Sequence, residues 1–403
     1  MKKTSQFRFI VGNETKRMLS LGHPWVIADR YTAKWPRSKT GDLIELLSEA
    51  NEPLGTALID PSARIVARVL SPKLIKLDCS WLQKCLHNAD QTRKWLNLSQ
   101  SNAWRLVNAE GDGLPGLCVD RYGDYLLVQY YTLAWEPHLA KIIQALNDHY
   151  QPLGIYAKFR PPQTRNQVVL KKVKAQLKIG QPIPNQYNII ENDLSFIVEL
   201  TNDLHTGLFF DQRDNRLMLK KMAGGQRVLN LFAYTGAFSV AAASGGATQV
   251  TSVDIAARYL DWAKENFWSN GIDPSAHEFI VGDCFAVVKN MKKEGRMFDT
   301  VLIDPPSFST THKSRFRTSG GTAELVKEAL GLLPSGGMLM TSSNLQKMSL
   351  SDYLKELRRA SIESKRSLKV INISSQSGDF PYAPTFPEGQ YLKFVTSIVQ
   401  DEF

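Results

Sequence analysis

The stretch 227–309 determines the fold of this chain. It reads RVLNLFAYTGAFSVAAASGG at 227–246, TQVTSVDIAARYLDWAKENF at 248–267, EFIVGDCFAVV at 278–288 and FDTVLIDPPSFS at 298–309. Each segment holds a short apolar run, and helical patterns separate the runs. Such alternation predicts right-handed βαβ crossovers and a parallel, doubly wound α/β sheet. Ligands of these sheets bind at the carboxyl ends of the strands, so we expect one small-molecule site at the residues that end the runs, Asn230, Asp254, Asp283 and Asp304.

These strand ends favour an adenosine ligand without phosphate groups. The turn after the first apolar run contains a single glycine, Gly236, so it lacks the GxGxxG fingerprint of dinucleotide sites. Asp254 follows Asn230 by 24 residues, where an acid can accept hydrogen bonds from both ribose hydroxyls, and Asp283 can accept from an adenine amino group. No lysine or arginine pair awaits phosphates, so S-adenosylmethionine fits better than NAD or ATP. The alternative is that these residues are helix caps and turn acids, but four in succession favour the cofactor.

Composition restricts the compartment and the class of protein. The 403 residues suffice for two or three domains. No apolar run resembles a signal peptide or approaches the roughly 20 residues of a membrane span. The absence of a CxxC pair argues against zinc motifs and a disulfide framework and predicts a reducing cytoplasm. The four cysteines are Cys79, Cys85, Cys118 and Cys284.

The net charge of +10 is concentrated outside the stretch 227–309. Residues 1–76 hold 13 basic and 7 acidic residues, giving +6, and residues 151–190 hold 7 basic residues and no acid, giving +7. A field of that sign attracts polyanions. Because the charge is localised, we favour nucleic-acid binding over a solvated lysine-rich surface.

The N-terminal segment 1–74 reads as short strands with turns and one helix, the pattern of a small β-barrel. Apolar and basic residues alternate in ARIVARVLS at 63–71, as on a half-exposed strand. We expect His23 and Trp25 to be packing residues. The side chains that can meet phosphate here are Arg30, Lys34, Arg64 and Arg68.

The segment 76–185 connects this barrel to the central stretch. Leu, Trp and Ile at helical spacing in 76–100 predict an amphipathic linking helix. Residues 101–185 predict a small α+β domain, with a hairpin around RYGD at 121–124 and a helix at 138–150. Several tyrosines beside basic residues can stack on bases, although packing is the expected role of most; they are Tyr125, Tyr130, Tyr131 and Tyr156.

Six motifs occur in order along the chain: HPWV at 23–26, EGDGLPGLCVDRYGD at 110–124, TGLFFDQRDNR at 206–216, NLFAYTGAFSV at 230–240, DPPSF at 304–308 and FPEGQYLK at 386–393. Together they resemble, almost end to end, the bacterial 23S rRNA methyltransferases that join an N-terminal PUA domain to a class I methyltransferase domain. The resemblance implies a PUA RNA-binding domain at 1–75 and a linking helix with a small α+β domain at 76–185. It further implies, at 186–403, a methyltransferase domain whose Rossmann-like seven-stranded sheet closes with an antiparallel hairpin.

The resemblance also implies S-adenosylmethionine as the cofactor and places the segment 211–213 near its methionine end. There the Gln212 amide and the Arg213 guanidinium suit an amino-acid carboxylate; alternatively, Arg213 forms a structural ion pair with Asp211. No metal ligand is predicted. The predicted cofactor-binding residues are Gln212, Arg213, Asn230, Phe232, Tyr234, Gly236, Asp254, Ile255, Asp283, Cys284, Asp304 and Pro305.

The acceptor atom decides which catalytic residues are needed. Carbon 5 of a pyrimidine is a poor nucleophile until a thiolate adds at carbon 6. The cytosine-5 relatives place that cysteine after the fifth strand, in a Ser-Cys-Ser-Gly run. Here the ungapped position reads TSSN at 341–344, with Asn344 where the cysteine would be. Cys284 lies at the adenine end and the other cysteines lie outside the catalytic domain, so cytosine-5 methylation is disfavoured.

A second branch of the resemblance is the guanine-N7 methyltransferase domain of a large-subunit rRNA enzyme. It shares the pattern RYLDWAKEN at 258–266, the DPPSFS run and an Asn-containing segment after strand five. N7 of guanine has a free lone pair and needs neither a thiolate nor a general base. An exocyclic nitrogen stays open as the acceptor, and a turn residue at a strand end is the alternative role for Asn344. The residues predicted to orient or stack on the base are Asp304, Ser307, Phe308 and Asn344.

The sequence therefore predicts an S-adenosylmethionine-dependent methyltransferase of 23S rRNA, cytoplasmic and monomeric or homodimeric, with guanine N7 or another nitrogen as acceptor. Two alternatives stay open: a cytosine-5 rRNA methyltransferase, and a non-catalytic RNA-binding assembly factor that keeps the cofactor fold. The loop THKSRFRTSGG at 311–321 is expected to cover the RNA strand through His312, Lys313, Arg315 and Arg317.

Overall fold

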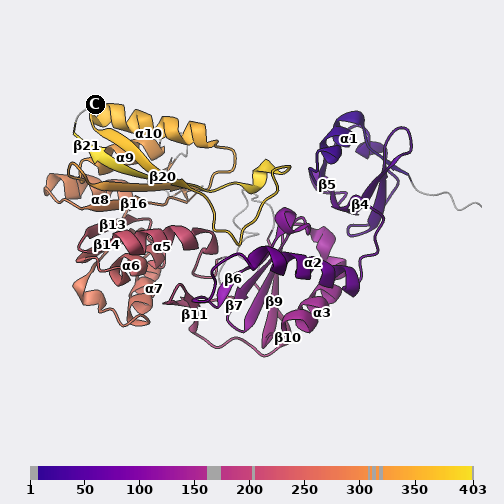
Figure 1. Cartoon of the computed structure of the whole chain (residues 1–403), viewed down its shortest axis with the longest axis horizontal. Helices are drawn as coiled ribbons and strands as arrows, with labels where there is room; N and C mark the ends of the chain where they lie inside the picture. The colour runs from indigo at the N-terminus through magenta and orange to yellow at the C-terminus, as the bar shows by residue number, and fades with distance from the viewer. Residues whose placement is uncertain are drawn as a thin grey trace, which may run out of the picture. The chain divides into compact units, whose positions relative to one another are not determined.

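The computed structural model of the protein describes residues 8–160, 174–201, 205–306, 309–310, 315–316 and 321–401. The chain forms two compact units, which are coloured by residue number in Figure 1. Unit 1 comprises residues 1–185, 199–205 and 378–389, and unit 2 comprises 186–198, 206–377 and 390–403. The segment 378–389 therefore belongs to unit 1, although the residues on either side of it belong to unit 2.

The N-terminal part of unit 1 is a five-stranded sheet of order β1-β3-β4-β5-β2. Buried and half-buried residues alternate along β3, as expected for a strand with one face on a core. The short strands predicted for this segment are present, with a helix α1 (Asn13–Ser20) between the first two. The strands are β1 (Phe9–Ile10), β2 (Trp25–Ile27), β3 (Leu43–Leu47), β4 (Pro53–Ile59) and β5 (Ile65–Ser71).

Of the residues singled out in this segment, His23 and Arg68 are buried and Trp25 is half-buried. The rings of His23 and Trp25 contact Phe386 edge to face, with centroids 5.3 and 4.9 Å away, and the Trp25 indole donates to Glu110 at 2.8 Å. Their predicted packing role is thereby confirmed. Arg68 is only 6% exposed, so the prediction that it meets phosphate is wrong: in β5 its side chain points into the protein. The exposed cations of the predicted set are Arg30, Lys34 and Arg64.

The second sheet of unit 1 is also five-stranded, in the order β10-β9-β8-β7-β6. One of its faces packs on two helices, α2 (Cys79–Arg93) and α3 (Leu139–Tyr150), through a continuous apolar core. The predicted hairpin at 121–124 is confirmed, because Tyr122 pairs with Tyr125 across Gly123. The strands are β6 (Ala103–Asn108), β7 (Leu117–Tyr122), β8 (Tyr125–Tyr130), β9 (Gly154–Phe159) and β10 (Gln176–Gly180).

The tyrosines of this sheet mostly serve packing, as predicted. Tyr125, Tyr130 and Tyr156 are buried. The Tyr125 hydroxyl donates to the Pro182 carbonyl at 3.2 Å, and the Tyr156 hydroxyl accepts from the Ile183 amide at 2.9 Å. These hydrogen bonds fix the chain that follows β10 and leave the rings unavailable for stacking on bases.

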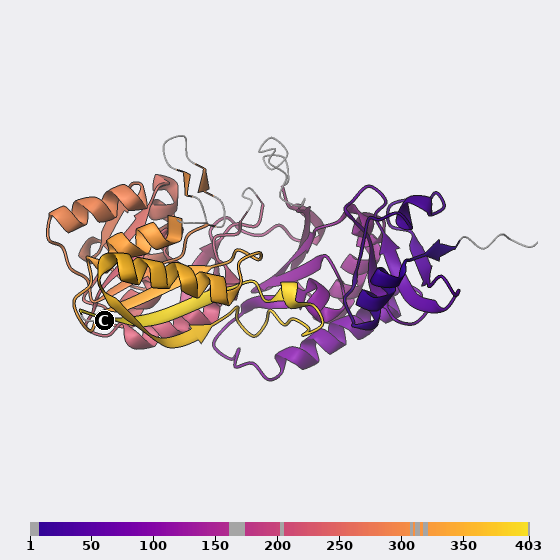
Figure 2. The ribbon, with the colours of Figure 1, turned by 90° about the horizontal axis from the view of Figure 1, so that it is seen from above.

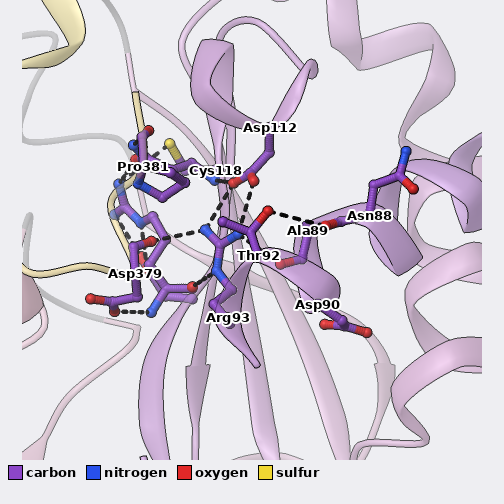
Figure 3. A network of polar contacts seen from close by, with 12 residues as sticks. Asn88, Ala89, Asp90, Thr92, Arg93, Asp112, Cys118, Asp379 and Pro381 are labelled. Atoms are coloured by element: carbon purple, nitrogen blue, oxygen red, sulfur yellow. Dashed lines mark hydrogen bonds and ion pairs between the residues drawn. The ribbon is translucent and has the colours of Figure 1, made fainter. Parts of the chain in front are cut away.

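A buried arginine holds the segment 378–389 within unit 1 (Figure 3). Arg93, at the end of α2, pairs with both carboxylate oxygens of Asp112 at 2.8 Å. Its three remaining N–H groups donate to the carbonyls of Ala89, Arg105 and Asp379 at 3.0, 2.7 and 2.8 Å. All five guanidinium donors are thus satisfied. The Asp379 carboxylate in turn accepts from the Arg105 amide at 2.8 Å, which ties the segment to β6.

Unit 2 is built on a seven-stranded sheet of order β15-β14-β13-β16-β19-β21-β20. The first five strands in this order are parallel, and β21 runs antiparallel to both of its neighbours. Figure 2 shows the C-terminal hairpin, in yellow, at the edge of this sheet. The strands are β13 (Arg227–Leu231), β14 (Gln249–Asp254), β15 (Glu278–Val281), β16 (Thr300–Ile303), β19 (Met338–Ser343), β20 (Ser367–Ser374) and β21 (Lys393–Gln400).

Helices cover both faces of the sheet, which confirms the predicted doubly wound α/β fold. The core on one face includes residues of α8 (Cys284–Lys293), α9 (Gly321–Leu330) and α10 (Leu350–Ser364). The core on the other face includes residues of α5 (Arg213–Met222) and α6 (Ala237–Ser244). Burial on both faces explains why the central strands are almost wholly apolar. The remaining elements of unit 2 are α7 (Ala257–Trp268), the hairpin β11 (Tyr187–Glu191) and β12 (Leu194–Val198), β17 (Ser309–Thr310) and β18 (Arg315–Phe316).

None of the helices in the described ranges is both long enough and apolar enough to span a membrane.

Candidate active site

The carboxyl ends of β13, β14, β15 and β16 meet at one edge of the sheet because these strands are parallel neighbours. Asp254 is the last residue of β14 and pairs with Val281 at the end of β15. Asp283 follows β15 by two residues, and Asp304 directly follows β16. The three acids therefore end neighbouring strands at the edge where ligands of such sheets bind.

The turn between β13 and α6 holds three residues with left-handed backbone, of which only one is glycine. Phe232, Tyr234 and Gly236 have φ angles of 59°, 51° and 73°. Left-handed backbone at a residue with a side chain costs about 1 kcal/mol relative to glycine, so two positions of this turn are strained. Motif matching misses this loop, because only the positive φ angles reveal its conformation; strain of this kind concentrates at functional sites.

The Asp254 carboxylate holds this turn in place. One of its oxygens accepts from the Tyr234 amide and the other from the Ala256 amide, each at 2.9 Å. A carboxylate oxygen has two acceptor positions, so each oxygen retains one for a ribose hydroxyl. The carboxylate therefore stabilises the strained turn, and its contact with a ribose stays a prediction.

Asn230 lies one layer deeper than the acids. Its side chain is buried, and its amide donates to the Ser239 hydroxyl at 2.9 Å, which shares a hydrogen bond with Ser252 at 2.7 Å. These contacts join β13, α6 and β14. They favour a structural role for the Asn230 side chain, and its contact with a cofactor stays a prediction.

Exposed apolar side chains mark the predicted adenine end. Ile255 is 53% exposed and Val281 is 56% exposed, at the ends of adjacent strands. Such isolated apolar surface beside two carboxylates suits an adenine ring, which needs a flat apolar contact and a polar rim. One Asp283 oxygen accepts from the Ala286 amide at 3.1 Å and so caps α8; this matches the helix-cap alternative, and a contact of Asp283 with the cofactor stays a prediction.

Asp304 occupies the centre of the site. It accepts from the Ser342 hydroxyl and, at 3.2 Å, from the Gln212 amide. Burial raises the pKa of its carboxyl to about 6, and the nearby Asp211 adds to that effect, while the two donors and Arg216 oppose it. An acid at this point is charged at neutral pH but close to titration. Pro305 beside it is buried, and the predicted Ser307 and Phe308 lie outside the described residues.

Gln212 and Arg213 are both buried at the start of α5. The Arg213 guanidinium lies 3.4 Å from Asp214, and the Asp211 carboxylate accepts from the Tyr391 hydroxyl at 2.6 Å. The predicted contacts of Gln212 and Arg213 with the cofactor carboxylate stay predictions. The amide nitrogen of Gln212 donates to Asp304 and to the Ser342 hydroxyl.

Asn344 is exposed and directly follows the last residue of β19. The loop that it begins is held by Lys393, which pairs with Ser343 across the sheet. The Lys393 ammonium donates to the carbonyls of Leu345 and Tyr391 at 2.6 and 2.8 Å. Burial lowers the pKa of Lys393 to about 8. Sequence reasoning did not single out this lysine, although it ends the motif FPEGQYLK.

Aromatic rings flank the strained turn: Tyr234 was a predicted site residue, but Phe209 and Tyr259 were missed. The Tyr234 ring contacts Phe209 and Tyr259, with centroids 5.5 and 4.5 Å away. The Arg258 guanidinium lies over the Tyr259 ring at 4.5 Å, and the Phe209 side chain is 43% exposed. The available signal was position, because Tyr234 and Tyr259 both lie just beyond the ends of parallel strands.

No thiolate is available in this site. Cys284 is buried, and burial raises the pKa of its thiol to about 12. The other three cysteines belong to unit 1, and all four are free. Across the described part of the chain, no group of three or more His, Cys, Asp or Glu side chains is arranged to hold a metal ion. The basic loop at 311–321, which was predicted to cover the RNA strand, falls mostly outside the described residues.

Strand order, the single antiparallel strand and the acids at the strand ends define the class of protein: a class I methyltransferase fold that uses S-adenosylmethionine. Residues 105–385 match the family of S-adenosylmethionine-dependent methyltransferases, and residues 9–72 match a PUA-like domain. The chain therefore belongs to the S-adenosylmethionine-dependent methyltransferase family and carries a PUA-like domain at its N-terminal side.

Similar proteins share this arrangement along nearly the whole chain. The chain is 31% identical over 394 residues to ribosomal RNA large subunit methyltransferase I of Klebsiella pneumoniae, with 96% of each chain covered. It is 32% identical over 394 residues to the protein of the same name from Erwinia tasmaniensis, with 96% of this chain and 98% of that one covered. A crystal structure of a protein assigned as a methyltransferase, complexed with SAH, is 30% identical with a TM-score of 0.87, covering 97% of this chain and 100% of that chain.

Proposed function

We propose that this methyltransferase modifies a base of large-subunit ribosomal RNA, and that the acceptor is a nitrogen, with guanine N7 as the first candidate. The observation that carries the choice of nitrogen is Asn344, which lies exposed just beyond β19 where the cytosine-5 branch has its cysteine. The thiol of Cys284 is buried and protonated at neutral pH, so it cannot replace that nucleophile.

The choice of RNA rests on two supports. The relatives similar over nearly the whole chain are named for large-subunit ribosomal RNA, and the N-terminal segment is a PUA-like domain, a module that binds RNA. The net charge of +10 agrees with a polyanionic partner. A cytoplasmic location, as a monomer or homodimer, belongs to the same proposal and agrees with the four free cysteines.

The site residues have separate roles in binding the cofactor and in orienting the base. Bound S-adenosylmethionine supplies an electrophilic methyl group, and in-line displacement then needs mainly correct distance and orientation. Asp254, Asp283 and the apolar Ile255 hold the adenosine end. Asp304 accepts hydrogen bonds from N–H groups of the base, and the Asn344 side-chain amide donates to an oxygen of the base. No residue has to remove a proton from a ring nitrogen that carries a lone pair.

The test is identification of the methylated nucleoside. Purified protein is incubated with methyl-labelled S-adenosylmethionine and unmodified large-subunit rRNA, and the RNA is digested to nucleosides. We expect labelled 7-methylguanosine with the native chain and much less label with Asn344→Ala. Another nitrogen-methylated nucleoside would keep the acceptor class but replace guanine N7.

Two outcomes would overturn the proposal. Labelled 5-methylcytidine would mean that cytosine-5 chemistry proceeds without a cysteine at position 344. Absence of label on both naked rRNA and unmodified ribosomal subunits, while the protein still binds S-adenosylmethionine, would indicate an RNA-binding assembly factor.

A further inference from the structure

We propose that Gln212 is a positioning residue for Asp304, held at the end of a hydrogen-bond chain that crosses unit 2, and that its side chain does not bind the cofactor carboxylate. The inference rests on the proposed function only for its effect on catalysis. Its structural part, the role of the amide, stands on the contacts of the described residues and is tested separately.

The chain of hydrogen bonds begins at the end of β20. The Ser374 hydroxyl donates to the Asn215 side-chain oxygen at 2.7 Å. The Asn215 amide then donates to the Gln212 side-chain oxygen, also at 2.7 Å. The Gln212 amide donates to Asp304 at 3.2 Å and to the Ser342 hydroxyl at 3.4 Å. Four elements, β20, α5 and the carboxyl ends of β19 and β16, are thus joined by one line of polar groups.

These hydrogen bonds leave Gln212 without an N–H group that could donate to a ligand. A glutamine amide has two N–H groups, and here one is directed at Asp304 and the other at Ser342. The side chain is only 4% exposed. A cofactor carboxylate accepts hydrogen bonds but donates none, so it would have to displace one of these two partners. Either the Asp304 carboxylate or the Ser342 hydroxyl would then lose a donor in a buried site, which is unfavourable.

The same hydrogen bonds also fix the orientation of the side-chain amides of Asn215 and Gln212. A serine hydroxyl can donate or accept, so the direction of these hydrogen bonds is set by the acceptor-only Asp304 carboxylate, which the nitrogen of Gln212 must face. The oxygen of Gln212 must therefore face Asn215. A rotated Gln212 amide would place its oxygen against the Asp304 carboxylate, where two acceptors repel. Asn215, whose nitrogen also lies 3.4 Å from the Ser375 carbonyl oxygen, and the Ser374 hydroxyl then complete the orientation that Asp304 requires.

The effect on Asp304 is to hold an ionised carboxylate in one orientation. Its other oxygen accepts from the Ser342 hydroxyl. The charged and titratable groups that act on it are Asp211, Arg216 and Tyr353, and Arg216 is itself paired with Glu191 at 2.7 Å. Burial and Asp211 favour the protonated acid, so the two neutral donors and Arg216 keep it charged. A charged, fixed acceptor is what recognition of a base N–H group requires.

The first test measures cofactor affinity without RNA. Gln212→Met keeps the length of the side chain and removes both donors. We expect its Kd for S-adenosylmethionine, measured by calorimetry, to stay within about twofold of the native value, because the cofactor does not contact the amide. Asp254→Asn serves as the comparison that weakens binding. A Gln212→Met loss of about tenfold or more would return Gln212 to the cofactor-binding set and overturn the proposal.

The second test follows the ionisation of Asp304. In Gln212→Met, loss of a donor raises the pKa of this carboxyl by about one unit, so the acidic limb of the pH–kcat profile moves upward by that amount. Asn215→Leu, which frees the Gln212 amide to rotate, moves it in the same direction. An unchanged limb in both variants would contradict the positioning role. Ser342→Ala, which removes the other donor, supplies the same readout if Gln212→Met fails to fold.

A readout that needs no methylation separates this inference from the proposed function. The carboxyl 13C resonance of Asp304, assigned by comparison with Asp304→Asn, is titrated in the native chain and in Gln212→Met. An upward shift of the titration midpoint in the variant supports the positioning role even if the RNA substrate is other than proposed. An unshifted midpoint would overturn the inference and leave the proposed function standing.

Discussion

The Lys393 ammonium lies 2.6 Å from the carbonyl oxygen of Leu345, the residue next to Asn344. This contact fixes the start of the loop after β19 from the opposite strand. Lys393 is only 6% exposed, and a buried lysine that donates to two carbonyls is a structural clamp. The position of the exposed Asn344 thus depends on a residue that is far from it in sequence.

Lys393→Met should loosen that loop without touching the cofactor residues. We expect kcat to fall by about tenfold, because misplacement of a positioned group slows transfer, and the Kd for S-adenosylmethionine to stay within about twofold. Steady-state kinetics and calorimetry measure the two quantities. Lys369 is an exposed lysine on the neighbouring β20. Its replacement, Lys369→Met, is the matched control and should leave kcat and the Kd unchanged. Equal losses in the two variants would rule out the clamp.

Asn344→Ala should lower kcat/KM for rRNA by about 10- to 100-fold, since a hydrogen bond made to the base in the transition state is lost. The Kd for S-adenosylmethionine should not change. Asn344→Asp, which keeps the size but loses the amide donor, should be nearly as impaired. If Asn344→Ala retains full activity, Asn344 is only a turn residue at the end of a strand.

Glycine at position 234 should give a more stable protein than alanine at the same position. The φ angle of Tyr234 is 51°, so Tyr234→Gly should be more stable than Tyr234→Ala by about 1 kcal/mol. Urea denaturation of the two variants measures the difference. Ala233, which is absent from the set of positive-φ residues, is the internal control: Ala233→Gly should lower stability. An alanine variant as stable as the glycine variant would show that the turn is not strained.

The buried carboxylate of Asp304 should lower the free energy of unfolding at neutral pH. Its pKa is raised to about 6 from 3.8, so the folded state binds more protons between these values. The stabilisation present at low pH is therefore lost as the pH rises through 6. Asp304→Asn removes the buried charge and should raise the free energy of unfolding by about 1–2 kcal/mol at pH 7.5.

That gain should disappear near pH 4.5, where the native carboxyl is largely protonated, and methyl transfer by Asp304→Asn should be strongly reduced. Urea denaturation at several pH values measures the first effect. A stability difference independent of pH would mean that the raised pKa is not the cause.

The Arg93–Asp112 pair should stabilise unit 1 strongly. Both side chains are almost fully withdrawn from solvent, so Arg93→Met leaves a buried carboxylate uncompensated and should lower the free energy of unfolding by about 3–5 kcal/mol. The exposed pair Arg17–Glu14 is the control, and Arg17→Met should leave thermal stability unchanged. Comparable effects in the two variants would show that burial of the Arg93 pair contributes nothing.

The fold could be predicted from the sequence because its signal is local. Apolar runs that alternate with helical patterns between 227 and 309 specify parallel strands, and parallel strands bring their carboxyl ends to one edge. Asp254, Asp283 and Asp304 could be placed at that edge for the same reason. The absence of a cysteine at Asn344, and with it the preference for a nitrogen acceptor, also needed no coordinates.

The tertiary structure decided what depends on partners distant in sequence. Arg68 alternates with apolar residues like an exposed strand cation, yet it lies inside unit 1. Gln212 has the chemistry of a carboxylate ligand, but Asn215, Ser342 and Asp304 occupy its amide. The positive φ angles of Phe232 and Tyr234 occur in a turn whose sequence lacks the glycine fingerprint. Periodicity records which face of an element is apolar, but only the packed chain determines which polar groups meet there and which donors remain for a ligand.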